Sequence, residues 1–249
     1  MIDRRTALVG GAGLLLAGCD QVAQIPAARK LLFTGETANR VLQRSLQTRL
    51  GGRGALAPEF TAADMSPIFR GNGTQNPGTP QYDALVANNF ADYRLRIDGL
   101  VDRPLSLSLA QIRSLPARTQ ITRHDCVEGW SAIGKWHGPL LGTLLKAAGV
   151  RAGARYIVCI CADFGGTYYD SIDLIDAFHP QTILAWAMND QPLSVVHGAP
   201  LRLRVERQLG YKQSKYIMEI RAVASLDGIG GGKGGYWEDN VDYDWYAGI

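Results

Sequence analysis

The sequence Arg123-His-Asp-Cys-Val-Glu-Gly-Trp-Ser131 contains the cysteine with the most unusual surroundings in this chain. It continues a run, 119–124, that alternates with the period of two typical of a β-strand. Cys126 has charged neighbours instead of the apolar ones of a buried structural thiol, and Arg123 and His124 favour its thiolate form. A thiolate attacks carbon or binds metal. From this stretch alone, a half-buried structural cysteine stays an alternative.

The N-terminal residues have the features of an export signal. Arg4-Arg5 resemble a twin-arginine signal and precede an apolar stretch, 7–18, that is too short to span a bilayer. The sequence Leu16-Ala-Gly-Cys19 has the small residues of a lipoprotein cleavage site. We therefore expect a signal peptide at 1–18 and a lipid anchor on Cys19, with a plain signal anchor as the alternative.

The rest of the sequence is typical of a globular protein. Of the 249 residues, 46% are hydrophobic and 20% are charged, and the net charge of +3 comes from scattered basic residues. This pattern excludes an extended nucleic-acid surface. Cys126, Cys159 and Cys161 are an odd number of cysteines beyond Cys19, which argues against a disulfide framework.

Two regions differ in composition. Residues 19–87 are polar and rich in glycine, with an amphipathic stretch at 41–50 and a loop at 70–80, and we expect a tether and an extension that wraps the main domain. Beyond them, alternation and apolar runs predict strands at 93–98, 155–161, 168–172, 183–188, 201–205 and 216–223. Ser108 and Gln111 predict a capped helix, and Pro139 a second helix that Gly149 closes. Short strands with few helices indicate the α+β class.

Two kinds of thiol site find little support. His124 and Cys126 are close, but the chain has no second pair of residues at zinc-ligand spacing. A thiol hydrolase needs a histidine beside Cys126, and nothing in the spacing of His137, His179 or His197 selects one. The remaining option is a metal cofactor that takes one protein thiolate.

Residues 123–131, followed by Trp136-His-Gly-Pro-Leu140, resemble the molybdopterin-binding domain of the sulfite oxidase superfamily. The nearest branch is that of the bacterial protein-methionine-sulfoxide reductase catalytic subunits and related exported proteins. The resemblance implies a sulfite-oxidase-type domain at 88–249 and a molybdenum–molybdopterin cofactor. It also implies that Cys126 is the protein ligand of the molybdenum.

Further segments carry the resemblance. Asn88-Asn-Phe-Ala-Asp92 is similar to the family's Asn-Asn-Phe-Tyr-Glu, His197-Gly-Ala-Pro-Leu-Arg202 to Asn-Gly-Ala-Pro-x-Arg, and Gly210-Tyr-Lys-Gln-Ser-Lys215 to Gly-Phe-Lys-Gly-x-Lys. The matched family positions bind the cofactor. They imply cofactor contacts at Asn88, Ala91, Asp92, Cys161, His197, Arg202, Gln213, Ser214 and Lys215, of which Ala91, Asp92, Cys161 and His197 depart from the branch's residues.

The residue types at these positions suit the implied cofactor. Molybdopterin ends in a phosphate, which calls for basic side chains, and Arg202, Lys212 and Lys215 are the best placed. An exposed strand face is the alternative for Arg202 and Lys215. Soft thiolate suits a dithiolene-bound metal. We expect Trp130 and Trp136 to serve packing and the aromatic tail at 236–246 to cover one rim of the domain.

These features together predict an exported, lipid-anchored, periplasmic oxidoreductase. The expected reaction transfers an oxo group, with a sulfoxide or another S- or N-oxide as substrate. The sequence has no haem-attachment Cys-x-x-Cys-His, so electrons are expected from a partner, which by resemblance is a membrane cytochrome b or a periplasmic electron carrier. Sulfite-type oxidation and a non-catalytic lipoprotein with a degenerate cofactor site are the alternatives.

Overall fold

The computed structural model describes residues 25–50 and 55–249, so the predicted signal peptide and Cys19 lie outside the described residues. The chain divides into two units, of which the second begins at Arg53. The first contains α2 (Pro26–Leu50), which is longer than the amphipathic stretch predicted at 41–50. No helix in the described part of the chain is both long and apolar enough to cross a membrane.

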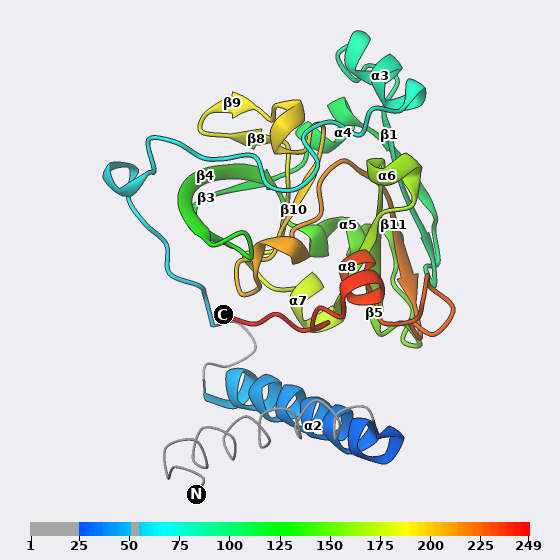
Figure 1. Ribbon diagram of the computed structural model, residues 1–249. Helices are drawn as coiled ribbons and strands as arrows, with labels where there is room; N and C mark the ends of the chain where they lie inside the picture. The colour runs from blue at the N-terminus through cyan, green and yellow to red at the C-terminus, as the bar shows by residue number, and fades with distance from the viewer. Residues whose placement is uncertain (1–24, 51–54) are drawn as a thin grey trace, which may run out of the picture. The chain divides into compact units, whose positions relative to one another are not determined.

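A five-stranded sheet forms one part of the second unit (Figure 1). β1 and β11 run parallel, and all other neighbours in this sheet run antiparallel. Its main core contains apolar side chains from β1, β5 and β11 and from the helices α4 (Leu109–Arg113) and α5 (Leu141–Ala148). Across the sheet, the strands are β2 (Leu105–Ser108), β1 (Arg94–Gly99), β11 (Ile217–Val223), β5 (Tyr156–Cys161) and β6 (Tyr169–Asp173).

A long hairpin forms the other main part and ends at Cys126. β3 (Ala117–Cys126) pairs with β4 (Trp130–Pro139) over its whole length, and Gly129 turns the chain with a φ of 85°. The sheet continues through β8 (Ala187–Met188) and β9 (Gln191–Pro192), while β7 (Ile183–Ala185) pairs with β10 (Arg202–Arg204).

The helices of this unit are short, and the α+β class is confirmed. The predicted capping box of Ser108 and Gln111 begins α4, and Gly149 ends α5 in a left-handed conformation. The helices are η1 (Ala62–Asp64), α3 (Pro80–Ala87), α4 (Leu109–Arg113), α5 (Leu141–Ala148), α6 (Asp163–Gly166), α7 (Leu174–Ala177), η2 (Val195–His197), η3 (Gly210–Lys212) and α8 (Tyr236–Val241).

Two predicted element bounds are wrong. Pro139 does not start α5, because β4 continues to Pro139, which lies opposite Ala117 at the end of the strand, where a missing N–H is tolerated. The strand predicted at 183–188 is interrupted at Trp186, since β7 pairs with β10 whereas β8 pairs with β4. The local sequence signals neither the extension of β4 to Pro139 nor the change of strand partner at Trp186.

Residues 55–79, the first described part of the second unit, wrap around its hairpin. The N–H of Phe60 donates to the carbonyl of Ile121 at 2.9 Å, and that of Ser66 to the carbonyl of Ile133 at 3.0 Å. In Figure 1 this segment, in cyan, passes over β3 and β4 before it reaches α3. The segment therefore reaches the end of the hairpin that carries Cys126.

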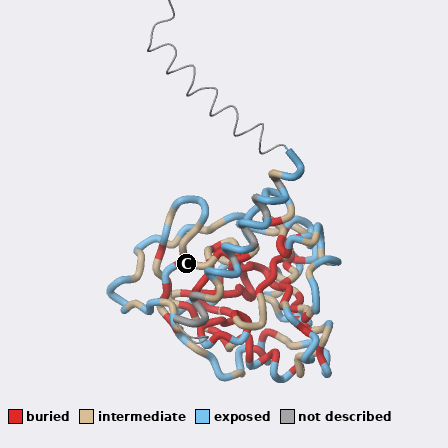
Figure 2. The backbone as a smooth tube through the Cα atoms, turned by 90° about the horizontal axis from the view of Figure 1, so that it is seen from below, coloured by how far each residue is buried: buried red, intermediate tan, exposed pale blue. Residues whose placement is uncertain are grey.

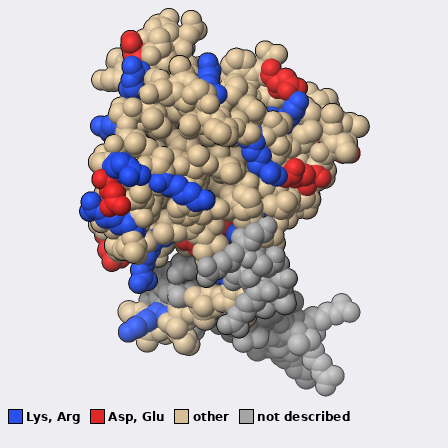
Figure 3. Space-filling model, turned by 180° about the vertical axis from the view of Figure 1, so that it is seen from behind, with Lys and Arg blue, Asp and Glu red and all other residues tan. Residues whose placement is uncertain are grey.

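Burial and charge follow this arrangement. Figure 2 shows the buried stretches gathered in the interior of the second unit and the exposed ones around it. On the face seen in Figure 3, basic groups are separated by neutral surface and interspersed with acidic groups. That face therefore carries no broad surface of one charge.

Candidate functional site around Cys126

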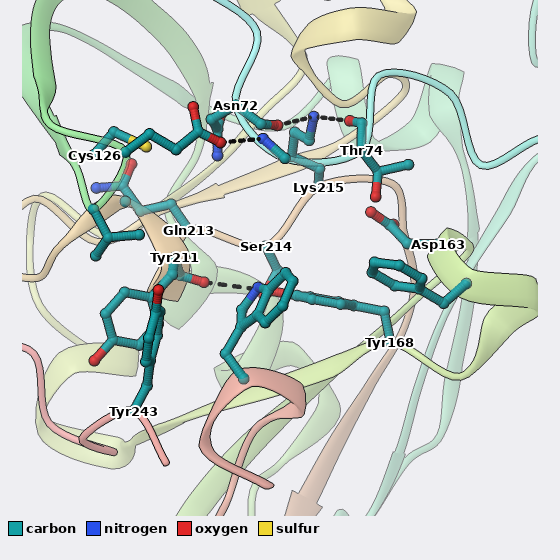
Figure 4. Close-up of a pocket in the computed structure, with 16 residues that line it drawn as sticks. Asn72, Thr74, Cys126, Asp163, Tyr168, Tyr211, Gln213, Ser214, Lys215 and Tyr243 are labelled. Carbon is teal, nitrogen blue, oxygen red and sulfur yellow. Dashed lines mark hydrogen bonds between the residues drawn. The ribbon is translucent and has the colours of Figure 1, made fainter. Parts of the chain in front are cut away.

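A cavity of about 240 Å³ lies at the end of the β3–β4 hairpin (Figure 4). Four segments that are distant in the sequence form most of its wall, at 72–74, 126–128, 163–168 and 210–215. Trp237 and Tyr243 of the C-terminal tail add an aromatic part to the wall, as expected for a tail that covers one rim. The cavity thus places Cys126 opposite residues that follow it by almost ninety positions.

The charges next to Cys126 in the sequence do not favour its thiolate, and that prediction is wrong. Arg123 is 56% exposed and pairs with Asp125 at 2.9 Å, away from the thiol. His124 is fully buried, and burial followed by the charges of Arg202 and Arg204 holds its pKa well below the usual value, so the ring is neutral. Burial also raises the pKa of Cys126, which Arg202 opposes. The positive charge near the thiol comes from Arg202 and Lys215, which are distant in the sequence.

Arg202 is fully buried and Lys215 is 6% exposed, so the alternative of an exposed strand face is excluded for both, and Arg204 is fully buried as well. Arg204 pairs with the buried Glu206 at 2.6 Å, and its guanidinium lies 4.2 Å from the centre of the Trp136 ring. Among the described residues Arg202 has no carboxylate partner of this kind, and it donates to Oδ1 of Asn72 at 3.0 Å. Burial lowers the pKa of Arg202 to about 9, which leaves it charged at neutral pH.

Gln213, Ser214 and Lys215 line the cavity, together with Cys126. The ammonium of Lys215 donates to the carbonyls of Asn72 at 2.7 Å and of Val196 at 3.0 Å, and also to that of Thr74. Burial, followed by the charge of Arg202, lowers the pKa of Lys215 to about 7. Lys215 therefore exchanges a proton close to neutral pH.

A buried polar network connects the cavity segment to the back of β3. Nη1 of Arg204 lies 3.1 Å from Nδ1 of His124, and because a guanidinium can only donate, Nδ1 is the acceptor. Oε1 of Gln213 lies 3.3 Å from the same ring nitrogen, and because both atoms then accept, this is a packing contact and not a second hydrogen bond. A Cβ on Gly210 would lie 2.5 Å from the His124 ring, so this position requires glycine. The network fixes the distance between β3 and the segment that carries Gln213.

Asp163 is a cavity residue that the sequence did not single out as functional. It is 4% exposed, and burial raises its pKa to about 7, although Lys215 and Thr74 oppose this. Phe164 and Gly165, which follow it, adopt left-handed conformations with φ of 49° and 72°. Such strain often marks a functional position. The available signal was a carboxylate directly after a buried strand and before a glycine turn.

The remaining predicted site residues do not line the cavity. Asn88 ends α3 and donates to Asp92 at 2.7 Å, and Ala91 and Asp92 are exposed. Cys161 is buried in β5, and His197 is half-buried in η2 beside Phe69. Arg202 does not line the cavity itself but donates to Asn72, which does. Their cofactor contacts stay predictions.

The polar groups around the cavity fit an anionic metal cofactor. Nε of Arg202, Nδ1 of His197 and Oδ1 of Asp163 are buried with no hydrogen-bond partner among the described residues. Burying such groups is costly unless a ligand pairs with them. Within residues 25–50 and 55–249, no group of three or more His, Cys, Asp or Glu side chains is placed to hold a metal. A metal at Cys126 would therefore take its other ligands from the cofactor.

Comparison with known proteins agrees with this chemistry. A family model described as oxidoreductase molybdopterin binding domain matches residues 81–226. A putative protein-methionine-sulfoxide reductase subunit of Azospira oryzae is 42% identical over 158 residues, which are 64% of this chain and 56% of that protein. The protein-methionine-sulfoxide reductase catalytic subunit of Xanthomonas campestris is 35% identical over 55% of this chain and 47% of its own length. The chain spans about half the length of these two relatives.

A longer match and a solved structure extend the comparison. The catalytic subunit of the same name from Gluconobacter oxydans is 30% identical over 226 residues, which are 75% of this chain and 72% of the relative. The sulfane dehydrogenase SoxCD of Paracoccus pantotrophus has a TM-score of 0.51 at 24% identity, over 54% of this chain and 39% of that one, and shows the fold alone. The family model covers more than half of the chain, and Cys126 lies at the cavity within it. The chain therefore belongs to the oxidoreductase molybdopterin-binding domain family, whose members are enzymes with the sulfite-oxidase-type fold.

Proposed function

We propose that this protein is an exported molybdenum–molybdopterin oxidoreductase that reduces a sulfoxide or another S- or N-oxide. The observation that carries the proposal is the position of the Cys126 thiol on a cavity shared with Gln213, Ser214 and Lys215. The reductase direction is supported by relatives named for protein-methionine-sulfoxide reduction.

The residues around the cavity suit separate roles toward the cofactor. Cys126 would provide the metal ligand, and a soft thiolate matches a metal that is also bound by dithiolene sulfur. Arg202 and Lys215 would meet the negative charge of the cofactor, and the free Oδ1 of Asp163 would accept from its N–H groups. When bound, the cofactor supplies two-electron oxo transfer.

The reaction also requires protons. Reduction of a sulfoxide consumes two electrons and two protons, breaks the S–O bond and yields a sulfide and water. Asp163 and Lys215 both have a pKa of about 7, so either can hold a proton at the cavity near neutral pH. The aromatic side chains of Phe164, Trp237 and Tyr243 give the cavity an apolar wall, which suits the organic groups of the substrate.

The electron donor and the location belong to the same proposal. The sequence has no haem-attachment motif, which supports a separate donor, either a membrane cytochrome b or a periplasmic carrier. The paired arginines at 4–5 and the cleavage pattern before Cys19 support export and a lipid anchor. Replacing Cys19 by alanine should release the protein from membranes, and unchanged retention would contradict lipidation.

The proposal is tested by metal analysis and turnover of protein purified after export. We expect close to one molybdenum per chain and reduction of members of a panel of sulfoxides and N-oxides with a reduced dye as donor. Cys126→Ala should lose both metal and turnover while it keeps the fold. Cys159→Ala is the matched control, because Cys159 is buried in the core and does not line the cavity.

The same preparation distinguishes the alternatives. A molybdenum content far below one per chain would support a non-catalytic lipoprotein. Oxidation of sulfite with a dye acceptor, without reduction of any oxide in the panel, would support sulfite-type oxidation. Either result would refute the proposed reductase.

A further inference from the structure

Residues 72–74 form part of the cavity wall and Gly71 precedes them, although all four lie outside the region that the family model matches. That match begins at residue 81, and these four residues belong to the loop between η1 and α3. Asn72, Gly73 and Thr74 all line the cavity, and Figure 4 shows Asn72 and Thr74 on either side of the Lys215 ammonium. The glycine-rich loop is therefore more than a connection to the domain.

The segment holds two basic side chains of the site, Arg202 and Lys215. Lys215 donates to the backbone carbonyls of Asn72 and Thr74, and Arg202 donates to the side-chain oxygen of Asn72. All three acceptors are neutral. These three hydrogen bonds thus hold the two side chains without pairing either with a carboxylate, although the charges of Asp163 and Glu128 also act on Lys215.

Two contacts fasten the segment in this position. Oε1 of Glu128 accepts from the N–H of Gly73 at 2.9 Å, and its Oε2 accepts from Nε1 of Trp130 at 3.0 Å. On the other side, Gly71 is packed against Val196 so closely that a Cβ would lie 2.3 Å from Cγ1 of that valine. A fit of this kind specifies one position of the backbone.

We propose that residues 71–74 are a positioning segment of the cofactor site, which orients Arg202 and Lys215 toward a bound anionic cofactor and is fastened by Glu128. The inference rests on the proposed function, because it assigns the segment a task toward that cofactor. Its physical basis is preorganisation. Arg and Lys side chains have many rotamers, and a cation that is already held loses less entropy when the ligand binds.

Asn72→Ala tests the side-chain contact, with Asn76→Ala as the matched control. Asn76 lies in the same loop, is exposed, and accepts from the N–H of Gly78 at 3.0 Å without a contact to the site. The measurement is molybdenum and released pterin per chain during dialysis of the purified holoprotein. We expect Asn72→Ala to lose cofactor about tenfold faster than the parent, the effect of one charge-assisted hydrogen bond, and Asn76→Ala to match the parent. Asn72→Asp keeps the acceptor but pairs Arg202 with a carboxylate, so it should not restore retention if a neutral acceptor is what matters.

Gly71→Ala tests whether the close packing of Gly71 against Val196 holds the segment in position, and a second substitution at Val196 can reverse its effect. The added Cβ would collide with Val196, so we expect faster cofactor loss and more rapid proteolysis of the loop at 70–80. Val196→Ala removes the colliding Cγ1, and the double variant Gly71→Ala/Val196→Ala should regain parental retention. A general loss of stability would not be reversed by truncating a second side chain.

The outcomes separate this inference from the proposed function. If the parent protein carries no molybdenum, the proposed function is wrong, and the positioning role of residues 71–74 is wrong as well. If the parent carries the cofactor and both Asn72→Ala and Gly71→Ala keep it at the parental rate, the positioning role is wrong while the proposed function stands. Melting temperatures of all variants show whether the fold is intact.

Discussion

Lys212→Met is expected to destabilise the protein strongly, because Lys212 is the cation of a fully buried charge cluster. Its ammonium donates to Asp170 of β6 and to Glu238 of α8, the latter at 2.5 Å, and none of the three side chains is more than 2% exposed. Burial lowers the pKa of Lys212, but the charges of the two carboxylates outweigh it and raise that pKa, so the lysine is charged. The cluster joins the C-terminal helix to η3, whose residues 210 and 211 line the cavity.

The magnitude follows from what the substitution leaves behind. Methionine fills nearly the same volume, so the lost packing is small. Two carboxylates stay buried without their cation, and breaking a buried pair in this way costs about 3–5 kcal/mol. For a unit of this size, such a loss lowers the melting temperature by about 6–20 °C.

The loss of stability in Lys212→Met is expected to depend on pH in one direction. Burial and then the charge of Glu238 raise the pKa of Asp170 even in the presence of Lys212, and removal of the cation raises it further. A carboxyl with a raised pKa in the folded state binds its proton more tightly there than in the unfolded chain. The contribution of the Asp170 carboxyl to the free energy of unfolding is full below its pKa of about 4 in the unfolded chain. That contribution is lost as the pH rises through the higher pKa of Asp170 in the folded protein. The deficit of Lys212→Met should therefore shrink between pH 7 and pH 5.

Urea denaturation of the cofactor-free protein at both pH values measures this deficit. Lys135→Met is the matched control, since Lys135 pairs with Asp190 at 2.7 Å on the surface, where the two side chains are 31% and 69% exposed. Such a pair contributes about 0–1 kcal/mol. If Lys212→Met costs no more than Lys135→Met at pH 7, or its deficit is the same at pH 5, the reasoning about the buried cluster is refuted.

Three further substitutions test other parts of the structure by denaturation of the cofactor-free protein. Asp163 has a pKa of about 7 in the folded protein against 3.8 for the free side chain, so its contribution to the free energy of unfolding falls between pH 4 and pH 7. Asp163→Asn should therefore be more stable than the parent at pH 8, by up to about 4 kcal/mol, but not at pH 4. Gly138→Ala should cost several kcal/mol because a Cβ would lie 2.0 Å from the carbonyl oxygen of Leu184, whereas Gly153→Ala, with nothing within 4 Å, should cost less than about 1 kcal/mol. Tyr82→Phe removes a buried hydrogen bond of 2.6 Å to a backbone carbonyl and should cost about 1–3 kcal/mol; an unchanged midpoint in urea would contradict that bond.

Local patterns in the sequence predicted elements well where neighbours along the chain decide the structure. The capping box at Ser108 and the glycine end of α5 are of this kind, and both are confirmed. The alternation of β3 predicted its strand but not the burial of Gln120, Thr122 and His124 on one face. These polar side chains are buried because Arg204 and Glu206 hydrogen-bond to them, and those partners follow eighty or more positions later.

The same distinction explains what the motif around Cys126 can and cannot say about function. The motif supplies the thiol and the strand that carries it, but Arg123 pairs with Asp125 and burial keeps His124 neutral, so neither basic neighbour favours the thiolate. The cations at the site are Lys215, which lines the cavity, and Arg202, and both donate to Asn72, which precedes the matched family domain. A chain with the motif but without these three residues would present the thiol to a cavity of different charge. Assigning cofactor binding to such a chain therefore requires the distant cations and the loop that holds them, as well as the cysteine.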